Sequence, residues 1–302
     1  MQDDPARAPY RFVYLRNVPD DAVPWDERNW FLSNPARENS FRQYRLNQWV
    51  QQSTRWMPMH LYTLCAGTEP TEPARLRAQL PRRPSWGGLD LASKLDLTAW
   101  CLLVPDGVDG HPSVVWRFWL PEAAVKFLDE HTDHRVSRWA KAGWITVTPG
   151  EVIDYDTVEA DISADCAELR VADMSYDEWS GEPVRQRLEK RTKAPMCPVP
   201  QTYRGLTPGM TEVMALTRSR AWSHHANCVA AWCFDNVEVP SPAGEPDLIR
   251  PDKPERGKTG KRIDAVPITA MADGGCAGRS CASHHAWPSW GEEPAEGNRL
   301  LR

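Results

Sequence analysis

The sequence predicts an α/β fold in which helices flank both faces of a mixed β-sheet. The first indication is a group of short apolar stretches separated by turn residues, which predict strands at residues 86–91, 97–104 and 114–120. A second indication is the alternation that follows. Helical periodicity is expected at residues 122–130, 136–142, 156–169 and 183–191, with strand-like stretches at 144–147, 170–176 and 199–203. A β-meander followed by alternating helices and strands favours a sheet covered on both sides.

Two more helices are expected towards the C-terminus. Thr207 and Pro208 form an N-cap and first-turn signature, which predicts a helix over residues 207–217. The last helix is expected to open at Asp264 and to stop at Gly274 and Gly275.

The composition changes twice along the chain and divides it into three parts. Residues 1–80 are rich in Pro, Arg and Trp and show weak periodicity, apart from a short amphipathic helix expected at 41–50. Residues 68–85 have the composition of a linker. The main domain is expected at 86–274, and the Gly-, Ala- and Ser-rich residues 275–302 are expected to be a disordered tail.

Charge and hydropathy narrow the class of protein. The net charge of −5 argues against non-specific coating of DNA, but a metal-dependent nuclease needs carboxylates. No apolar run approaches the ~18 residues of a membrane span, and the acidic N-terminus lacks a signal-peptide core. We therefore expect a cytoplasmic protein with no membrane partner.

Three aspartates occupy positions from which they can converge. Asp90 and Asp177 each end a predicted strand, and Asp264 opens the last predicted helix. Carboxylates gathered at one point repel each other unless cations neutralise them, and hard oxygen ligands suit Mg²⁺ or Mn²⁺. Two such ions ~3.5–4 Å apart can activate water and stabilise a leaving 3′ oxygen. Taken singly, each aspartate also fits an ordinary helix cap or turn.

An ordered series of motifs resembles the nuclease domain of phage terminase large subunits. The segment GLDLASKLDLTAW resembles the first nuclease motif of that family, and MSYDEW resembles its second acidic motif. Between them, GWITVTPGEVIDYDTV is similar to the family's segment before the second acidic strand. The stretch QTYRGLTP, the run SHHANC with Trp232 and Asn236, and the closing Lys253 and KRID follow in the family's order. Upstream, residues 33–35 and 41–50 are similar to the end of the family's ATPase domain and its hinge.

The resemblance implies a ribonuclease H-like nuclease that cuts concatemeric phage DNA during packaging. It implies that Asp90, Asp177 and Asp264 hold two Mg²⁺ or Mn²⁺ ions. Ser93 and Asp96 lie in the first motif, where Asp96 either acts through an outer-shell water or caps the next strand. The partners implied are double-stranded DNA, the terminase small subunit and the portal protein.

Candidate DNA-binding residues come from the basic segment 253–262 and from the SHHANC run. They are Lys253, Lys258, Lys261, Arg262, His224 and Asn227. His224 and Asn227 are equally expected to pin their loop. A second basic stretch at 185–193 fits either a phosphate contact or a solvated helix face.

The sequence departs from full-length members of the family. It contains no G-x-x-x-x-G-K-[ST] phosphate loop, because Asp252 stands where Gly257-Lys258-Thr259 would need the first glycine. We therefore expect no ATPase activity from this chain alone and a possible separate ATPase partner. Residues 1–80 would then be a remnant of the ATPase domain in a fragment, split gene product or truncated reading frame. Cys228 and Pro267 also differ from the family's usual residues.

Two other functions share these features. A transposase, integrase or resolvase on the same fold would carry the same acidic triad. A non-catalytic module that docks on the portal or motor would keep the fold without the activity. The SHHANC and KRID segments favour the terminase, and the three filled acidic positions argue against loss of activity.

Overall fold

The computed structural model describes residues 56–67, 73–92, 96–108, 110–177, 182–242, 244–245, 247–253 and 260–276. Residues Met1–Trp56 and Met57–Arg302 form two separate compact units. Every described helix and strand belongs to the second unit, and the expected helix at 41–50 lies outside the described residues.

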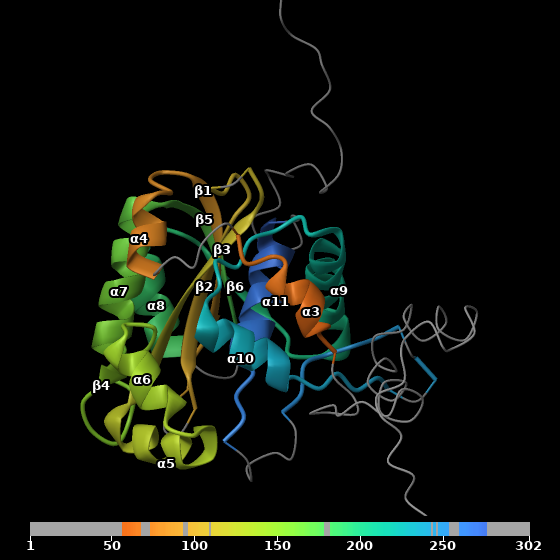
Figure 1. The fold of residues 1–302 in the computed structure, drawn as a ribbon. Coiled ribbons are helices and arrows are strands. Elements are labelled where there is room, and N and C mark those ends of the chain that lie inside the picture. Colours follow the sequence, from red (N-terminus) through yellow and green to blue (C-terminus); the bar gives the residue numbers. More distant parts are fainter. Residues whose placement is uncertain are drawn as a thin grey trace, which may run out of the picture. The chain divides into compact units, whose positions relative to one another are not determined.

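Six strands of the described residues form one mixed sheet in the order β4-β3-β2-β1-β5-β6 (Figure 1). Their bounds are β1 Pro84–Asp90, β2 Thr98–Val104, β3 Ser113–Pro121, β4 Thr146–Thr148, β5 Arg170–Asp177 and β6 Met196–Val199. β1, β2 and β3 form the expected antiparallel meander. β4, β5 and β6 each pair in parallel with a neighbour. The predicted mixed sheet is therefore confirmed.

Helices cover both faces of this sheet, as the sequence predicts. Their bounds are α3 Met59–Thr63, α4 Pro73–Ala78, α5 Glu122–Thr132, α6 Arg135–Lys141, α7 Tyr155–Glu168, α8 Glu182–Thr192, α9 Tyr203–Ser219, α10 Cys228–Asn236 and α11 Ala265–Cys276. Figure 1 shows α4, α7 and α8 on one side of the sheet and α9, α10 and α11 on the other. Within the described residues, no helix is long and apolar enough to cross a membrane.

The face beneath α4, α7 and α8 carries the main hydrophobic cluster. Trp100 and Trp119 are fully buried there, and Leu76, Ile162 and Leu188 from the helices belong to the same cluster. Side chains of this size bury enough apolar surface to fix the helix layer on the sheet.

On the opposite face, α11 lies directly against the sheet because glycine leaves room for its backbone. A Cβ added at Gly88 of β1 would come within 2.1 Å of the Ile268 carbonyl oxygen. A Cβ at Gly209 of α9 would come within 2.0 Å of the Ala270 carbonyl oxygen. α11 is thus held between the sheet and α9 at two close approaches, which fixes where its N-terminal end points.

Gly209→Ala is expected to lower the free energy of unfolding by about 1–3 kcal/mol, because the added methyl group meets backbone that cannot move alone. Gly274→Ala in α11 is the matched control, since within the described residues no atom outside its own helix backbone lies within 4 Å of its added Cβ. Alanine is the better helix former, so the control should gain about 0.5–1 kcal/mol. Urea unfolding of both variants measures the difference, and equal stabilities would contradict the close approach.

The start of α9 differs from the prediction. The helix begins at Tyr203, because the Thr202 hydroxyl caps it by accepting a hydrogen bond from the Gly205 amide at 3.1 Å. Pro208 therefore lies inside the helix and does not open it. The strand expected at 199–203 is misplaced: β6 covers Met196–Val199 and shares only Val199 with the expected range, because the cap and first turn of α9 occupy residues 202–203.

Other boundaries also differ from the prediction. α11 continues through Gly274 and Gly275, which do not stop it. A Cβ at Gly275 would lie 2.8 Å from Asp173 Oδ1, so this glycine provides close packing. The expected linker at 68–85 contains α4 and the first residues of β1, and Leu80 is completely buried. Residues 57–67 and 73–80 thus belong to the same compact unit as the sheet.

Candidate functional site

Asp90 and Asp177 end two neighbouring parallel strands. Asp90 is the last residue of β1, and Asp177 is the last residue of β5. The register pairs Leu89 with Tyr176, so the next residue on each strand is one of the two aspartates. Adjacent strands lie about 4.8 Å apart. The prediction that these residues lie on neighbouring strands is confirmed, and both backbones reach the same edge of the sheet.

Asp264 approaches the same edge from the helix layer. It directly precedes α11, which packs over β1, β2 and β5. Its side chain is buried, and its Oδ2 atom has no hydrogen-bond partner within the described part of the chain. A buried carboxylate oxygen without a partner is costly, and a bound cation would remove that cost.

The pKa of Asp90 depends on the charges of the other two candidate carboxylates. Burial raises the pKa of Asp90 well above its usual value, and the charges of Asp264 and Asp177 raise that pKa further. Burial also raises the pKa of Asp264, while the ammonium of Lys253 opposes that shift. These carboxylates therefore repel one another in the metal-free protein.

Lys253 supplies the cation nearest to these carboxylates among the described residues. Its Nζ lies 3.3 Å from Asp264 Oδ1 and also pairs with Asp96 Oδ2. Burial lowers the pKa of Lys253, but the charges of Asp264 and Asp96 outweigh it and the net shift is upward. The lysine therefore stays protonated and balances part of the acidic charge.

Asp96 has a role that the sequence did not predict. It was expected to act through an outer-shell water or to cap the next strand. It joins Lys253 and Arg262, whose Nε lies 2.6 Å from Asp96 Oδ1. Asp96 is far from both basic residues in the sequence, and no spacing pattern links it to them. Ser93 lies outside the described residues.

The basic residues expected to contact DNA differ in how exposed their side chains are. Arg262 is buried against Asp96, and its Nη1 donates to the Lys261 carbonyl oxygen at 2.9 Å, so we no longer assign it to DNA contact. Lys261 is half-buried and stays a candidate. Lys258 lies outside the described residues.

His224 and Asn227 are also withdrawn as DNA contacts, because the structure places both inside the protein. The His224 ring stacks on Tyr62 with 3.9 Å between centroids, and its Nε2 lies 2.7 Å from the Tyr62 carbonyl oxygen. Burial lowers the pKa of His224 to about 4, so it is neutral at pH 7. Asn227 caps α10 by accepting hydrogen bonds from the amides of Val229 and Ala230. Both residues fix the loop, which was the alternative expectation.

The donor atoms at this edge suit a hard divalent cation, but the side chains do not yet enclose one. Within the described residues, no three His, Cys, Asp or Glu side chains are gathered closely enough to hold a metal ion. Carboxylate oxygens are the ligands that Mg²⁺ and Mn²⁺ prefer. The buried Asp264 Oδ2 offers such a donor, and the ammonium of Lys253 lies beside the other oxygen of the same carboxylate. The chemistry of the residues fits the ion predicted from the sequence.

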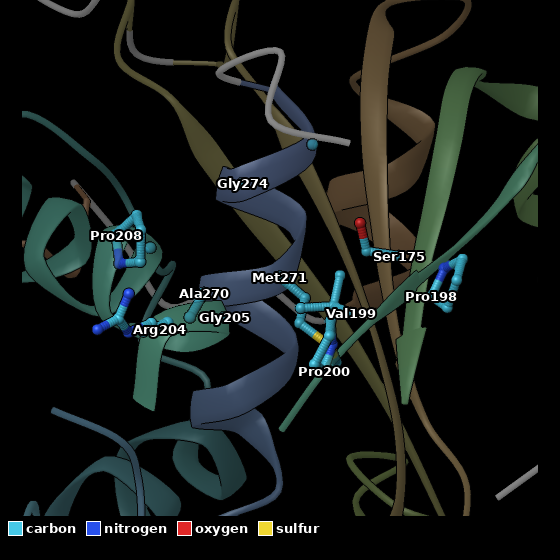
Figure 2. A pocket seen from close by; sticks show the side chains of 12 residues that line it. Ser175, Pro198, Val199, Pro200, Arg204, Gly205, Pro208, Ala270, Met271 and Gly274 are labelled. Atoms are coloured by element: carbon cyan, nitrogen blue, oxygen red, sulfur yellow. The ribbon is translucent and has the colours of Figure 1, made fainter. Parts of the chain in front are cut away.

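A pocket of about 280 Å³ lies elsewhere on α11. Figure 2 shows it between α9, α11 and the ends of β5 and β6, with Ser175, Val199 and Met271 among the residues lining it. None of the three candidate aspartates lines this pocket, but Val199, which does, is the register partner of Asp177.

Comparisons with known proteins agree with the architecture. The family model described as "Terminase large subunit, endonuclease domain" matches residues 32–274. The "Terminase, large subunit" of Enterobacteria phage HK97 is 25% identical over 302 residues, which cover 90% of this chain and 56% of that protein. "Protein YmfN" of Escherichia coli (strain K12) is 25% identical over 249 residues, which cover 80% of this chain and 53% of that protein.

The crystal structure of the HK97 bacteriophage large terminase has the same fold over the shared region. It superposes with a TM-score of 0.61 at 24% identity, covering 83% of this chain and 49% of that chain. This chain thus spans about half the length of the relatives it matches. The sheet is the ribonuclease H-like sheet of terminase nuclease domains. The family model covers most of the chain, and on that match the chain belongs to the terminase large subunit endonuclease-domain family.

Proposed function

We propose that this chain is a divalent-metal-dependent endonuclease that cuts concatemeric phage DNA during genome packaging. The observation that carries the proposal is the placement of Asp90 and Asp177 at the same edge of the sheet, with Asp264 beside them at the start of α11. Membership of the endonuclease-domain family supports the same reaction.

In this proposal Asp90, Asp177 and Asp264 hold two Mg²⁺ or Mn²⁺ ions. The bound ions supply the charge that activates water and stabilises the leaving 3′ oxygen. The rigid strand ends fix two carboxylates, and the glycine-tight packing of α11 fixes the third.

Lys253 and Lys261 are proposed to contact the DNA backbone next to the acidic residues. Lys253 already lies beside Asp264, so its ammonium can meet a phosphate held there. Lys258 belongs to the same basic segment and is proposed with them. Double-stranded DNA, the terminase small subunit and the portal protein are the proposed partners, with ATPase activity supplied by a separate chain.

A nicking assay tests this function. The purified chain should convert supercoiled plasmid to nicked and linear DNA with Mg²⁺ or Mn²⁺, without added ATP and without strong sequence preference. EDTA should stop the reaction, because the carboxylates alone provide no catalyst for phosphodiester hydrolysis. Cleavage that survives EDTA and exhaustive metal removal would contradict the proposal.

A further inference from the structure

A second pocket, which is lined by charged side chains, lies away from Asp90, Asp177 and Asp264. Its volume is about 340 Å³, and it is lined by Arg77 and Ala78 of α4, Arg117 of β3, the loop residue Arg82 and Glu168 at the end of α7. Arg82 lies two residues before β1, whose other end carries Asp90. A strand of this length spans about 20 Å at ~3.3 Å per residue. The pocket and the acidic edge are therefore at opposite ends of β1.

Two guanidinium groups in this pocket share one buried carboxylate. Arg117 makes two hydrogen bonds to Asp165, from Nε at 2.7 Å and from Nη2 at 2.6 Å. Arg77 shares the same carboxylate, with its Nε 3.0 Å from Asp165 Oδ1. Asp161 lies farther off, 3.7 Å from Arg117 Nη1, and also accepts a hydrogen bond from Trp119. The fully buried carboxylate of Asp165 thus pairs with the guanidinium groups of both Arg77 and Arg117.

One hydrogen-bond donor of Arg77 is unused. Its side chain is 8% exposed, yet its buried Nη1 has no hydrogen-bond partner within the described residues. Burial lowers the pKa of Arg77, and the charge of Asp165 opposes that shift. Arg117 adds to the lowering, whereas Glu168 and Asp161 oppose it. A buried guanidinium nitrogen without a partner is destabilising until an acceptor reaches it.

Arg82 and Glu168 border the same pocket from the outside. Arg82 is exposed with φ of 57°, and its amide donates to the Glu168 carbonyl oxygen at 2.7 Å, which fixes the turn that carries its side chain. The Glu168 side chain is exposed, so water screens its negative charge more than the charges inside.

We propose that this pocket binds a phosphate group, with the Nη1 of Arg77 as the inner donor and Arg117 and Arg82 beside it. Phosphate presents several acceptor oxygens at once, and arginine is the side chain best suited to meet them. An incoming phosphate would occupy the unused donor of Arg77. The phosphate belongs either to a small molecule or to a DNA backbone.

Titration of the full chain with inorganic phosphate tests the site. Calorimetry and thermal melts are run at constant ionic strength, with NaCl replacing phosphate in the reference. Phosphate should bind and raise the melting temperature of the unmodified chain. Arg77→Gln should weaken binding about tenfold or more, the loss expected for one charge-assisted hydrogen bond.

Ala78→Glu provides a second variant that leaves the buried ion pairs intact. Ala78 is exposed at the pocket, so the new carboxylate should compete with phosphate and weaken its binding by a similar factor. Arg204→Gln removes an arginine that is 84% exposed on α9 and should leave phosphate binding unchanged. If the unmodified chain does not bind phosphate, or if the two pocket variants bind it as well as Arg204→Gln, the proposal is wrong.

A short DNA duplex identifies the source of the phosphate. If the duplex competes with inorganic phosphate and Arg77→Gln weakens duplex binding, the pocket takes a backbone phosphate. If the duplex does not compete, the pocket takes a small phosphate compound. Because the readout is binding at a site remote from Asp90, the outcome is independent of whether the chain cleaves DNA.

Discussion

Asp90→Asn, Asp177→Asn and Asp264→Asn are each expected to reduce metal-dependent DNA cleavage by at least about a thousandfold. The substitution keeps the size of the side chain and removes the charge that holds the metal. If the three carboxylates act as one unit, double variants should be scarcely worse than single ones, because losses within a unit do not add. Initial rates of plasmid nicking at saturating Mg²⁺ or Mn²⁺ measure the loss.

Asp90→Asn, although it abolishes cleavage, should increase the thermal stability of the metal-free protein. Asp90 is disfavoured as a charged group by burial and by the neighbouring carboxylates, so Asp90→Asn should raise the melting temperature measured in EDTA. The rise should be a few degrees, at about 2–4 °C for each kcal/mol. Magnesium should then stabilise the variant less than it stabilises the unmodified chain.

Asp133→Asn is the matched control for both measurements. Asp133 is exposed at the end of α5 with φ of 52°, a conformation that asparagine tolerates well. Asp133→Asn makes the same chemical change at an exposed residue, so the cleavage rate of this variant and its stabilisation by magnesium should equal those of the unmodified chain. Full cleavage by Asp177→Asn would place the chemistry elsewhere in the protein.

The sequence predicts the sheet well because buried strands have a strong local signal. β1, β2 and β3 are largely apolar runs bounded by polar or turn residues, and β5 alternates apolar and polar residues from Ala172 onward. Each begins and ends within a few residues of its expected position. Asp90 and Asp177 could be placed at one edge for the same reason, since each ends such a strand. Their position depends on strand ends and on little else.

Features that depend on distant partners could not be predicted in this way. Gly275 could be a helix stop or a close-packing position, and only the approach of Asp173 decides between them. His224 looks like an exposed polar residue until Tyr62 stacks on its ring. Asp96 pairs with Lys253, which is separated from it by 157 positions in the sequence. In each case the decisive contact is a tertiary one that no local pattern records.

Lys253→Met is expected to destabilise the metal-free protein. In the structure the ammonium of Lys253 pairs with Asp96 and Asp264, and the Asp264 side chain is only 5% exposed. Removing the lysine leaves a buried carboxylate without its nearest positive charge. The free energy of unfolding in EDTA should fall by about 1–3 kcal/mol, less than for a fully buried pair because Lys253 is partly exposed.

Divalent metal should then stabilise Lys253→Met more than it stabilises the unmodified chain. The lysine and a metal ion compete for the same carboxylate, so metal binding to the variant no longer displaces a bound ammonium. Thermal melts with increasing Mg²⁺ measure this difference. Lys261→Met is the matched control: it should leave metal-free stability unchanged, and it should flatten the salt dependence of DNA binding by about one unit if it makes one phosphate contact. If Lys253→Met and Lys261→Met have the same stability in EDTA and the same response to magnesium, Lys253 does not act as a substitute cation at Asp264.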